Sequence, residues 1–518
     1  MKGDRSIHVL LAGLLLGLLS ACASLPPRME QAPVPAFAGP AETSLGALTE
    51  PAAQAHPGQS GFLVLESGRQ ALLQRALLIE AAERSIDAQY YIWNSDASGR
   101  YLACRLYAAA ERGVRVRLLL DDMNVAGRDS VIAALDRHPH IDIRIFNPSP
   151  NRGGIGKWLA FASEFQRLNR RMHNKALVAD AAFGIVGGRN IGDEYFDLHP
   201  QANFRDRDVL AAGPIAQEVS AKFDAFWNSP LAYPIAVLAP AAAADVDPVA
   251  LFERNCHPAN EAIRALQDAT RNSPEVSARL AETLAGLTWA EAELVFDPPA
   301  TGDEAGSDAP QRSALALAAL VEQARGEILV ESAYLILGDA QLEMVAALRD
   351  RGVRVAALTN SLASNDLTTN HSGYARRRKA MLDAGLELYE LRPDAADCVV
   401  WIEGRDDCGP AIVGLHSKSA VFDRSTVYIG SFNLNLRSIY LNSETVLLIH
   451  SPELAGQVAA AIEGALAPAN SWRVSRDADG QVRWSAGPGQ EWTHEPATGA
   501  WHRFKSGLLR LVPMEKYL

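Results

Sequence analysis

The sequence predicts an α/β protein made of two duplicated domains, each a largely parallel β-sheet flanked by helices, with one active site at their pseudo-twofold interface. One set of polar residues and glycines occurs twice, 243 positions apart, with its internal spacings kept. Residues 108–123 and 346–361 also resemble each other, and the glycines within them, Gly113 and Gly352, are 239 positions apart. Because the two offsets nearly agree, duplication of a whole domain explains both.

The elements of the two halves follow the same order. A strand pattern follows a helical one at residues 85–91 and again at 327–334. A second helix then ends at Arg-Gly in each half and leads into a strand rich in Val and Leu. Strands that are almost continuously apolar are typical of a sheet covered on both faces.

The length of 518 residues suggests about three units. We expect a signal peptide over 1–21, a lipid-bearing cysteine with a flexible tether over 22–60, and a first domain over 61–240. A helical connection and loop should occupy 241–310, and a second domain 311–470. Four tryptophans among turn residues in 471–518 suggest a small strand-rich C-terminal appendage.

The N-terminus predicts export. Lys2 and Arg5 precede an apolar stretch too short to span a membrane, and Leu-Ser-Ala-Cys ends at Cys22. This ending resembles the bacterial lipobox, which implies cleavage before Cys22 and lipidation of that cysteine. The expected protein is a membrane-anchored lipoprotein of the cell envelope facing the periplasm. Ala23 and Ser24 after the cysteine favour the outer membrane; the alternative is an ordinary signal peptide.

Charge and cysteine spacing restrict the partners. The net charge of −12 argues against a nucleic-acid-binding protein, which needs a basic surface. Without a C-x-x-C pair, a structural zinc site is not expected, and the sequence calls for no metal and no cofactor. Cys398 and Cys408 flank a short polar turn, so we expect a local disulfide between them.

The repeated set has the composition of a phosphoryl-transfer site. Histidine can act as nucleophile or general acid, and lysine and asparagine suit the oxygens of a phosphoryl group. The candidate catalytic residues are His173, Lys175 and Asn190 in the first half and His416, Lys418 and Asn433 in the second. Two such sets facing one phosphate would let one histidine attack phosphorus while the other protonates the leaving alkoxide.

The other members of the set have supporting roles. Asp180 and Asp423 end short strands and are expected to hold turns, and Gly187, Gly188, Gly430 and Ser431 let the backbone turn close to the substrate. Asp206 and Glu444 lie at matching positions before Gly-Pro and Ser-Pro, and each could orient an imidazole. For Asp206, a surface carboxylate is an equal alternative, and Asp208 is its competitor.

Residues 157–172 precede the first histidine and read as a basic amphipathic helix. Trp158, Phe161, Phe165, Leu168 and Met172 fall on one helical face among several arginines. Such a helix could lie in an anionic bilayer interface, or pack on the core as an ordinary helix.

The paired motif resembles that of the phospholipase D superfamily, over roughly residues 61–470. Within it the chain is most similar to bacterial cardiolipin synthases, through the segments 192–196, 371–374, 433–438 and 442–444. The resemblance implies a phosphohistidine intermediate, no metal, and transfer of a phosphatidyl group to a phospholipid alcohol such as phosphatidylglycerol. By the same resemblance His173 is the nucleophile and His416 the acid and base, although the residues alone do not order them.

Two alternatives stay open for the reaction. Water as acceptor would make the protein a phospholipase D that forms phosphatidic acid. A phosphodiesterase or nuclease is an alternative from another functional class, but the acidic charge and the anchor speak against it. The expected partners are phosphatidylglycerol, with phosphatidylethanolamine as a second candidate lipid, and a membrane reached through Cys22 and residues 157–172.

Overall fold

The computed structural model describes residues 25–27 and 32–518, apart from 126, 153, 241–245, 248, 251, 253–255, 271–272, 301–308, 405–406, 408–411 and 513. The predicted signal peptide and Cys22 lie outside the described residues.

The first half forms one sheet whose strands pair in the order β9, β4, β3, β2, β5, β6, β8, β1. Along the chain these strands are β1 (Ser60–Leu65), β2 (Ser85–Tyr90), β3 (Arg115–Asp121), β4 (Ile141–Phe146), β5 (Ala176–Ala179), β6 (Phe183–Gly187), β8 (Asp208–Ala212) and β9 (Ala232–Pro234).

The second half repeats this arrangement in the order β18, β13, β12, β11, β15, β16, β17, β10. Its strands are β10 (Thr288–Phe296), β11 (Glu327–Ser332), β12 (Arg354–Asn360), β13 (Glu387–Leu391), β15 (Lys418–Phe422), β16 (Thr426–Gly430), β17 (Thr445–His450) and β18 (Ser471–Arg476). The duplication predicted from the sequence is therefore present in the fold.

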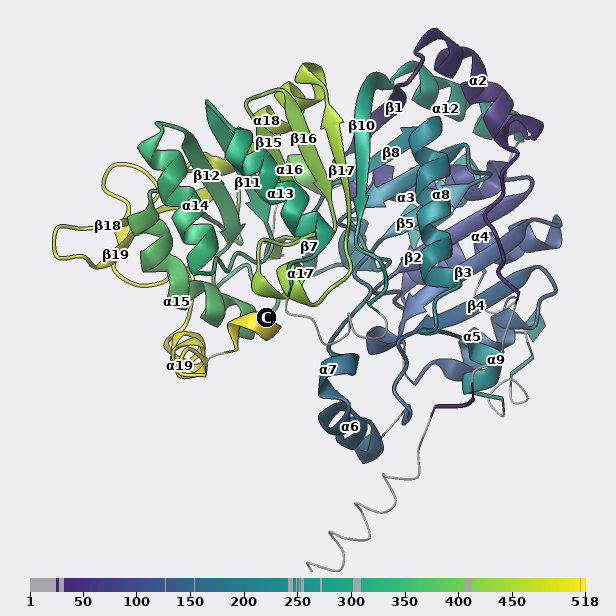
Figure 1. Cartoon of the computed structure of the whole chain (residues 1–518), viewed down its shortest axis with the longest axis horizontal. Coiled ribbons are helices and arrows are strands. Elements are labelled where there is room, and N and C mark those ends of the chain that lie inside the picture. The colour runs from purple at the N-terminus through teal and green to yellow at the C-terminus, as the bar shows by residue number, and fades with distance from the viewer. Residues whose placement is uncertain are drawn as a thin grey trace, which may run out of the picture.

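The two sheets join through β10. It pairs with β17 over its whole second part, and its first residues pair with β1 of the first half. Figure 1 shows β10 standing between the two halves. This strand lies where a helical connection was expected, whereas α11 (Glu261–Ala269) and α12 (Ser273–Ala285) in the same region are helical as predicted.

The sheets are mixed rather than largely parallel, which corrects the sequence-based prediction. Within these two sheets, β2–β3–β4 and β11–β12–β13 pair in parallel and the other strand pairs are antiparallel. Three residues connect β5 to β6, and so short a connection joins antiparallel strands only. Asp180 and Ala181 in this turn both have a φ of 51°, and Asp423 and Arg424 in the equivalent turn both have a φ of 49°.

Helices cover both faces of each sheet (Figure 1). In the first half, α3 (Gly68–Ala81), α4 (Ala97–Glu111) and α5 (Asp129–Asp136) lie on one face and α8 (Pro214–Trp227) on the other. Their counterparts are α13 (Arg312–Gln323), α14 (Asp339–Asp350) and α15 (Thr368–Ala384), with α18 (Pro452–Leu466) opposite. Successive side chains of a strand point to opposite faces of the sheet, so each strand contributes residues to two hydrophobic cores.

The segment before β1 is not the flexible tether that its composition suggested. The Val34 N–H donates to Asn228 at 3.0 Å and the Ala36 N–H to Asp224 at 2.6 Å. After the turn η1 (Pro40–Glu42), α2 (Ser44–Ala55) is capped by the Thr43 hydroxyl and buries Leu45 in the first core. The few apolar residues of α2 suffice to hold this helix in place because they pack into the core of the first half.

A disulfide links Cys104 of α4 to Cys256, 152 positions away. No sequence pattern pointed to this pair. Cys398 at the start of α16 (Cys398–Trp401) is also disulfide-bonded, while Cys408, its predicted partner, lies outside the described residues.

The C-terminal residues extend the second half rather than standing apart. β18 pairs with β13, β19 (Val482–Ser485) with β18, and β20 (Glu491–Trp492) with β19. Trp472 and Trp484 are buried in the second core. The chain then forms α19 (Ala500–Leu509) and η6 (Glu515–Tyr517). In the described part of the chain, no helix is long and apolar enough to cross a membrane.

Candidate active site

Each motif histidine is paired with a carboxylate of the opposite half. The Nδ1 atom of His173 donates to Oε2 of Glu444 at 2.8 Å, and Nδ1 of His416 donates to Oδ2 of Asp206 at 2.6 Å. All four side chains are buried. The sequence had put Asp206 and Glu444 forward as imidazole-orienting acids without assigning them to a histidine, and the structure shows that the pairs cross between the halves.

Backbone pairing across the interface produces this crossing. The His173 N–H donates to the carbonyl of Ser443, the residue before Glu444, at 2.9 Å. The His416 N–H donates to the carbonyl of Arg205, the residue before Asp206, also at 2.9 Å. On the second side the contact widens into a small parallel sheet of β7 (Ala202–Arg205) and β14 (Ile412–Leu415). The main chain thus sets each imidazole beside its carboxylate.

The tautomer of His173 follows from its contacts. Its Nδ1 atom faces the Glu444 carboxylate and also the carbonyl oxygen of Ser431 at 3.0 Å. Two acceptors at one nitrogen require the proton there, so Nε2 of the neutral ring carries the free electron pair. The carboxylate of Asp206 imposes the same tautomer on His416.

Burial and nearby charges favour neutral imidazoles beside ionised carboxylates. Burial, aided by the charges of Lys175 and Lys418, lowers the pKa of His173 to about 4 and that of His416 to about 3, although the facing carboxylates oppose this shift. Burial alone would raise the pKa of Asp206 and Glu444, but the facing histidine and the nearby lysines hold both values below the ordinary range. A neutral Nε2 is the form that can attack phosphorus.

The two lysines supply the positive charge of the site. Each follows its histidine by two positions and donates to that histidine's carbonyl, Lys175 at 2.6 Å. Burial lowers the pKa of Lys175 to about 7 and that of Lys418 to about 8, and repulsion from Lys418 contributes to the lowering at Lys175. An incoming phosphate would offset this repulsion, since its charge is opposite to both.

The motif glycines and Ser431 make room for the carboxylates and hold them. A β-carbon on Gly188 would lie 2.0 Å from Oδ1 of Asp206, so that position admits only hydrogen. Ser431 takes the equivalent place in the second half and donates from its hydroxyl to Oε2 of Glu444 at 2.5 Å. A β-carbon on Gly187 would lie 2.5 Å from the Cα atom of Asp208 in β8, and one on Gly430 would lie 2.3 Å from the carbonyl oxygen of Thr445 in β17.

The two motif asparagines differ in their contacts. Asn190 accepts from the Ile92 N–H and donates to the Tyr195 hydroxyl, both at 3.1 Å. Asn433 is buried, and its Oδ1 has no hydrogen-bond partner among the described residues. Asn433 is therefore the motif amide that the protein leaves available to a ligand.

Asp180 and Asp423 do not reach the histidines. Asp180 accepts the N–H groups of residues 83–85, each at 2.8 Å, and Asp423 accepts those of residues 325–327. Each carboxylate thus holds the turn that leads into β2 or β11. Asp208, the competitor of Asp206, pairs with Arg75 at 2.9 Å instead of a histidine.

Several residues near the site were not among the site residues predicted from the sequence. The ring of Tyr91 meets His173 edge-on at 5.1 Å, and Tyr195 meets His416 in the same way at 5.1 Å. Below them, the buried carboxylate of Glu331 bridges Arg205 and Arg207, the latter at 2.6 Å, and so ties the halves together. Tyr91 ends the repeated strand segment at the position equivalent to Tyr334 in the second half, and this repetition is a signal by which it could be predicted as a site residue.

Residues 157–172 do not form the continuous basic helix that the sequence predicted. They fold as the end of α6 (Gly154–Ser163) and the short α7 (Phe165–Leu168), and Met172 bridges to Ser443 as extended chain. Arg167 pairs with Glu164, and Arg171 is buried against Asp121. The guanidinium groups of Arg167 and Arg171 are therefore paired within the protein.

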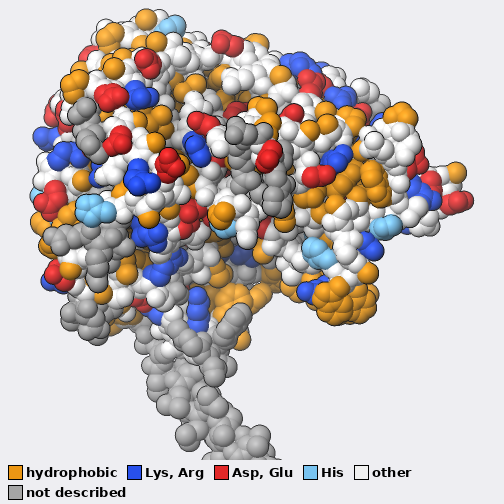
Figure 2. Space-filling view, turned by 180° about the vertical axis from the view of Figure 1, so that it is seen from behind, with side chains coloured by type: hydrophobic (Ala, Val, Ile, Leu, Met, Phe, Trp, Pro, Cys, Tyr) orange, Lys and Arg blue, Asp and Glu red, His pale blue; other side chains and the backbone are white. Residues whose placement is uncertain are grey.

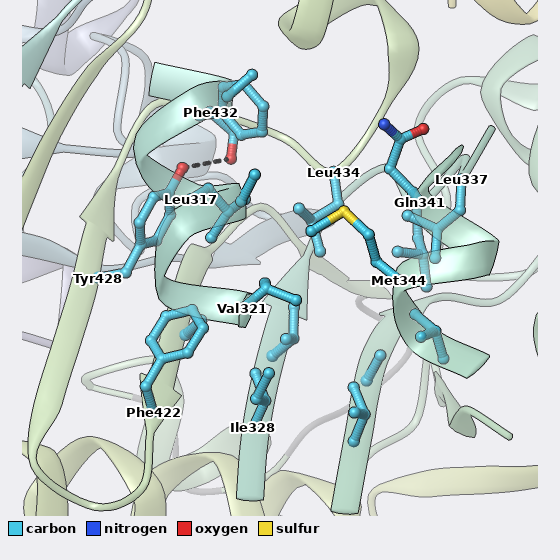
Figure 3. A pocket seen from close by; sticks show the side chains of 18 of the residues that line it. Leu317, Val321, Ile328, Leu337, Gln341, Met344, Phe422, Tyr428, Phe432 and Leu434 are labelled. Carbon is cyan, nitrogen blue, oxygen red and sulfur yellow. Dashed lines mark hydrogen bonds between the residues drawn. The ribbon is translucent and has the colours of Figure 1, made fainter. Parts of the chain in front are cut away.

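An apolar cavity of about 180 Å³ lies in the second half, separate from the histidines. Figure 3 shows Leu317 and Val321 of α13, Ile328 of β11 and Met344 of α14 around it, with Phe432 and Leu434 at its upper side. These last two flank Asn433, so the second motif loop alternates between the polar site and this cavity. Within the described residues, no group of three or more His, Cys, Asp or Glu side chains is placed to hold a metal ion.

Comparison with known proteins agrees with this geometry. The family model described as "Cardiolipin synthase, PLD-like domain" matches twice, at residues 76–227 and 317–465, once in each half of the fold. The chain belongs to the phospholipase D superfamily. Within that superfamily it is 37% identical to cardiolipin synthase C of Escherichia coli (strain K12) over 474 residues, covering 90% of this chain and 98% of the relative.

Two further similarities fit the phospholipase D superfamily. A cardiolipin synthase of Staphylococcus aureus (strain Mu50) is 23% identical over 441 residues, covering 84% of this chain and 69% of that protein. The crystal structure of phosphatidylserine synthase from Haemophilus influenzae Rd KW20 superposes with a TM-score of 0.54 at 15% identity, over 89% of this chain and 96% of that one. The second likeness supports the two-domain phospholipase D fold.

Proposed function

We propose that the protein is a phosphatidyltransferase of the cardiolipin synthase type, which transfers a phosphatidyl group through a phosphohistidine to the hydroxyl of a second phospholipid such as phosphatidylglycerol. The observation that carries the proposal is the pair of crossed histidine–carboxylate contacts, at 2.8 and 2.6 Å, above two buried lysines. The similarity to cardiolipin synthases over 90% of the chain supports the transferase reaction.

In the first step, Nε2 of His173 attacks phosphorus, and the bond from phosphorus to the leaving glycerol oxygen breaks. That oxygen takes a proton from Nε2 of His416. The negative charge of the bound phosphodiester favours protonation of one imidazole, which opposes the effect of burial on its pKa. The products of this step are a phosphatidyl-His173, a neutral His416 and a free alcohol.

In the second step, the neutral His416 accepts the proton of an incoming hydroxyl, and the oxygen attacks phosphorus. The bond between phosphorus and Nε2 of His173 breaks, and the histidine returns to its starting state. Lys175 and Lys418 offset the charge on the non-bridging oxygens in both steps, and the Nδ2–H group of Asn433 is the neutral donor assigned to them. His173 is assigned as the nucleophile because its Nδ1 has two acceptors, which fix the tautomer most firmly.

The proposed place of action is the periplasmic side of the envelope, with the protein anchored through lipidated Cys22 and the outer membrane preferred. The Leu-Ser-Ala-Cys sequence supports the anchor. The disulfide between Cys104 and Cys256 supports an oxidising compartment, where such bonds persist.

The test supplies the purified, detergent-solubilised protein with phosphatidylglycerol, with and without phosphatidylethanolamine, and identifies the products by mass. Cardiolipin with release of glycerol is expected, and phosphatidic acid without cardiolipin would overturn the transferase proposal in favour of hydrolysis. His173→Ala and His416→Ala should each abolish turnover. Palmitate labelling of the wild type against Cys22→Ala tests the anchor separately.

A further inference from the structure

The C-terminal helix α19 presents its apolar side to solvent. Trp501, Phe504 and Leu508 are 65%, 60% and 58% exposed, and Leu511 just beyond the helix is 77% exposed. Spacings of three and four residues place these side chains on one helical face. In Figure 2, an orange surface at the lower right marks this part of the molecule.

The opposite face of α19, which packs on the protein, is polar. Ser506 is fully buried, and its carbonyl accepts the Ser372 hydroxyl of α15 at 3.1 Å. His502 contacts Thr368 at 3.3 Å. A surface helix of a globular protein ordinarily does the reverse and buries its apolar stripe. The large apolar side chains on the outer face of α19 are therefore free to contact a second apolar phase outside the protein.

The helix is held rigidly in this orientation. Arg510 pairs with Glu495 at 2.7 Å, and Arg376 of α15 pairs with Glu515 at 2.9 Å. Trp501 and Phe504 stack with ring centroids 5.5 Å apart. The exposed face is thus a preformed surface and not a frayed end.

The charge of this segment differs from that of the whole chain. Residues 499–518 contain Arg503, Lys505, Arg510 and Lys516 but one acid, Glu515, in a protein of net charge −12. Lys505 is exposed beside the ring of Trp501, with Nζ 5.5 Å from the ring centroid. Tryptophan next to lysine on an apolar helical face suits the headgroup region of an anionic bilayer.

The segment also adjoins the chain that leads to His173. The ring of Tyr517 meets Phe165 of α7 at 5.1 Å. Arg437 donates both to the Tyr517 carbonyl at 3.2 Å and to the side chain of Asn169, four residues before His173, at 2.8 Å. Figure 1 shows α6, α7 and α19 at the same lower end of the molecule.

We propose that α19 and the residues after it form a membrane-docking surface, defined by Trp501, Phe504, Leu508 and Leu511, which rests in the interface of an anionic phospholipid bilayer beside the active site. The inference rests on the proposed function, because that function requires two phospholipids to enter from a bilayer. It assigns the contact to α19, whereas the arginines of residues 157–172 are committed within the protein.

The experiment uses the full chain with Cys22→Ser, which removes the predicted lipidation. Binding to sedimented vesicles of phosphatidylglycerol with phosphatidylcholine is compared with binding to phosphatidylcholine alone. The variant W501S/F504S/L508S should weaken binding to the anionic vesicles by at least about tenfold. The matched control V249S/L315S/V400S, whose side chains are 56–73% exposed elsewhere, should bind as the parent does.

Two readouts separate this inference from the proposed function. Turnover of a dispersed short-chain phosphatidylglycerol should be unchanged in W501S/F504S/L508S, while turnover of vesicle lipid should fall with binding. If the parent does not turn over the short-chain lipid, the proposed function fails, and the vesicle binding still decides the role of α19. Equal vesicle binding by the parent and W501S/F504S/L508S would overturn the docking surface. So would a change from dimer to monomer with vesicle binding unaltered, because a second copy would then cover this face.

Discussion

The Nδ1 atom of His173 lies 2.8 Å from the Oε2 atom of Glu444, although the two residues come from opposite halves of a duplicated chain. His416 and Asp206 repeat the relationship at 2.6 Å in the other direction. Each half therefore provides one imidazole and the carboxylate that orients the imidazole of the other. In each half, the acid orients the histidine of the other half, so the site is complete only when both halves are joined.

Replacing an orienting carboxylate should reduce turnover without abolishing substrate binding. Glu444→Gln places an amide opposite the Nδ1–H of His173 and removes the charge that favours its proton. We expect kcat for phosphatidylglycerol to fall by about a hundredfold, with a smaller change in KM. The exposed Glu343→Gln on α14 is the control. Unchanged kcat in Glu444→Gln would mean that the contact does not serve the reaction.

Gly188 should tolerate no side chain. In Gly188→Ala the β-carbon would lie 2.0 Å from Oδ1 of Asp206, so the carboxylate must leave His416. A loss of activity of about a hundredfold is expected from steady-state kinetics. Gly456→Ala in α18 meets open space, and should keep full activity with stability equal to or above wild type by up to about 1 kcal/mol. Wild-type activity in Gly188→Ala would show that Asp206 can orient His416 from another position.

Phosphate binding should weaken as the pH rises above neutrality. Burial lowers the pKa of Lys175 from 10.5 to about 7 and that of Lys418 to about 8, so in the free enzyme both amines lose their protons across this range. The protonated amines are the forms that attract an anion, so affinity must fall as they titrate. Calorimetric binding of inorganic phosphate between pH 6 and 9 measures this. Lys175→Arg, which stays charged, should flatten the decline, and a pH-independent affinity of the wild type would contradict the assignment.

The buried bridge at the interface should contribute strongly to stability. Glu331→Gln leaves the guanidinium groups of Arg205 and Arg207 without their shared counter-charge. We expect the free energy of unfolding in urea to fall by about 3–5 kcal/mol. The exposed pair Arg349–Asp350 serves for comparison, because Asp350→Asn should change stability by less than about 1 kcal/mol. A similar small effect of Glu331→Gln would mean that this bridge does not hold the halves together.

The catalytic side chains could be predicted from the sequence because their chemistry and spacing are local. His, Lys, Asp and Gly recur at one offset, and the acids Asp206 and Glu444 follow at matching positions. The pairing of each acid with the opposite histidine is set by main-chain contacts between the halves, such as His173 N–H to Ser443 carbonyl. Such contacts leave no periodic trace in a sequence.

Other features escaped prediction because tertiary contacts override local preference. The residues of β10 include Ala, Glu and Leu, which favour helix, yet the strand pairs with β1 and with β17. Residues 32–60 read as a tether, although Val34, Ala36 and Leu45 all find partners in the folded body. The spacing of 152 residues between Cys104 and Cys256 carries no signal of a disulfide. The short turns at Asp180 and Asp423 make antiparallel strands where alternating helices suggested parallel ones.

We expect that two histidines act on one phosphate and that only one of them becomes covalently modified. The protein is mixed with phosphatidylglycerol, denatured during turnover at mildly alkaline pH, and digested for peptide mass spectrometry. We expect a phosphatidyl-derived adduct on His173, at no more than one per chain, which is lost in His173→Ala and absent from His416. Adducts on both histidines, or full turnover with no adduct on either, would contradict it.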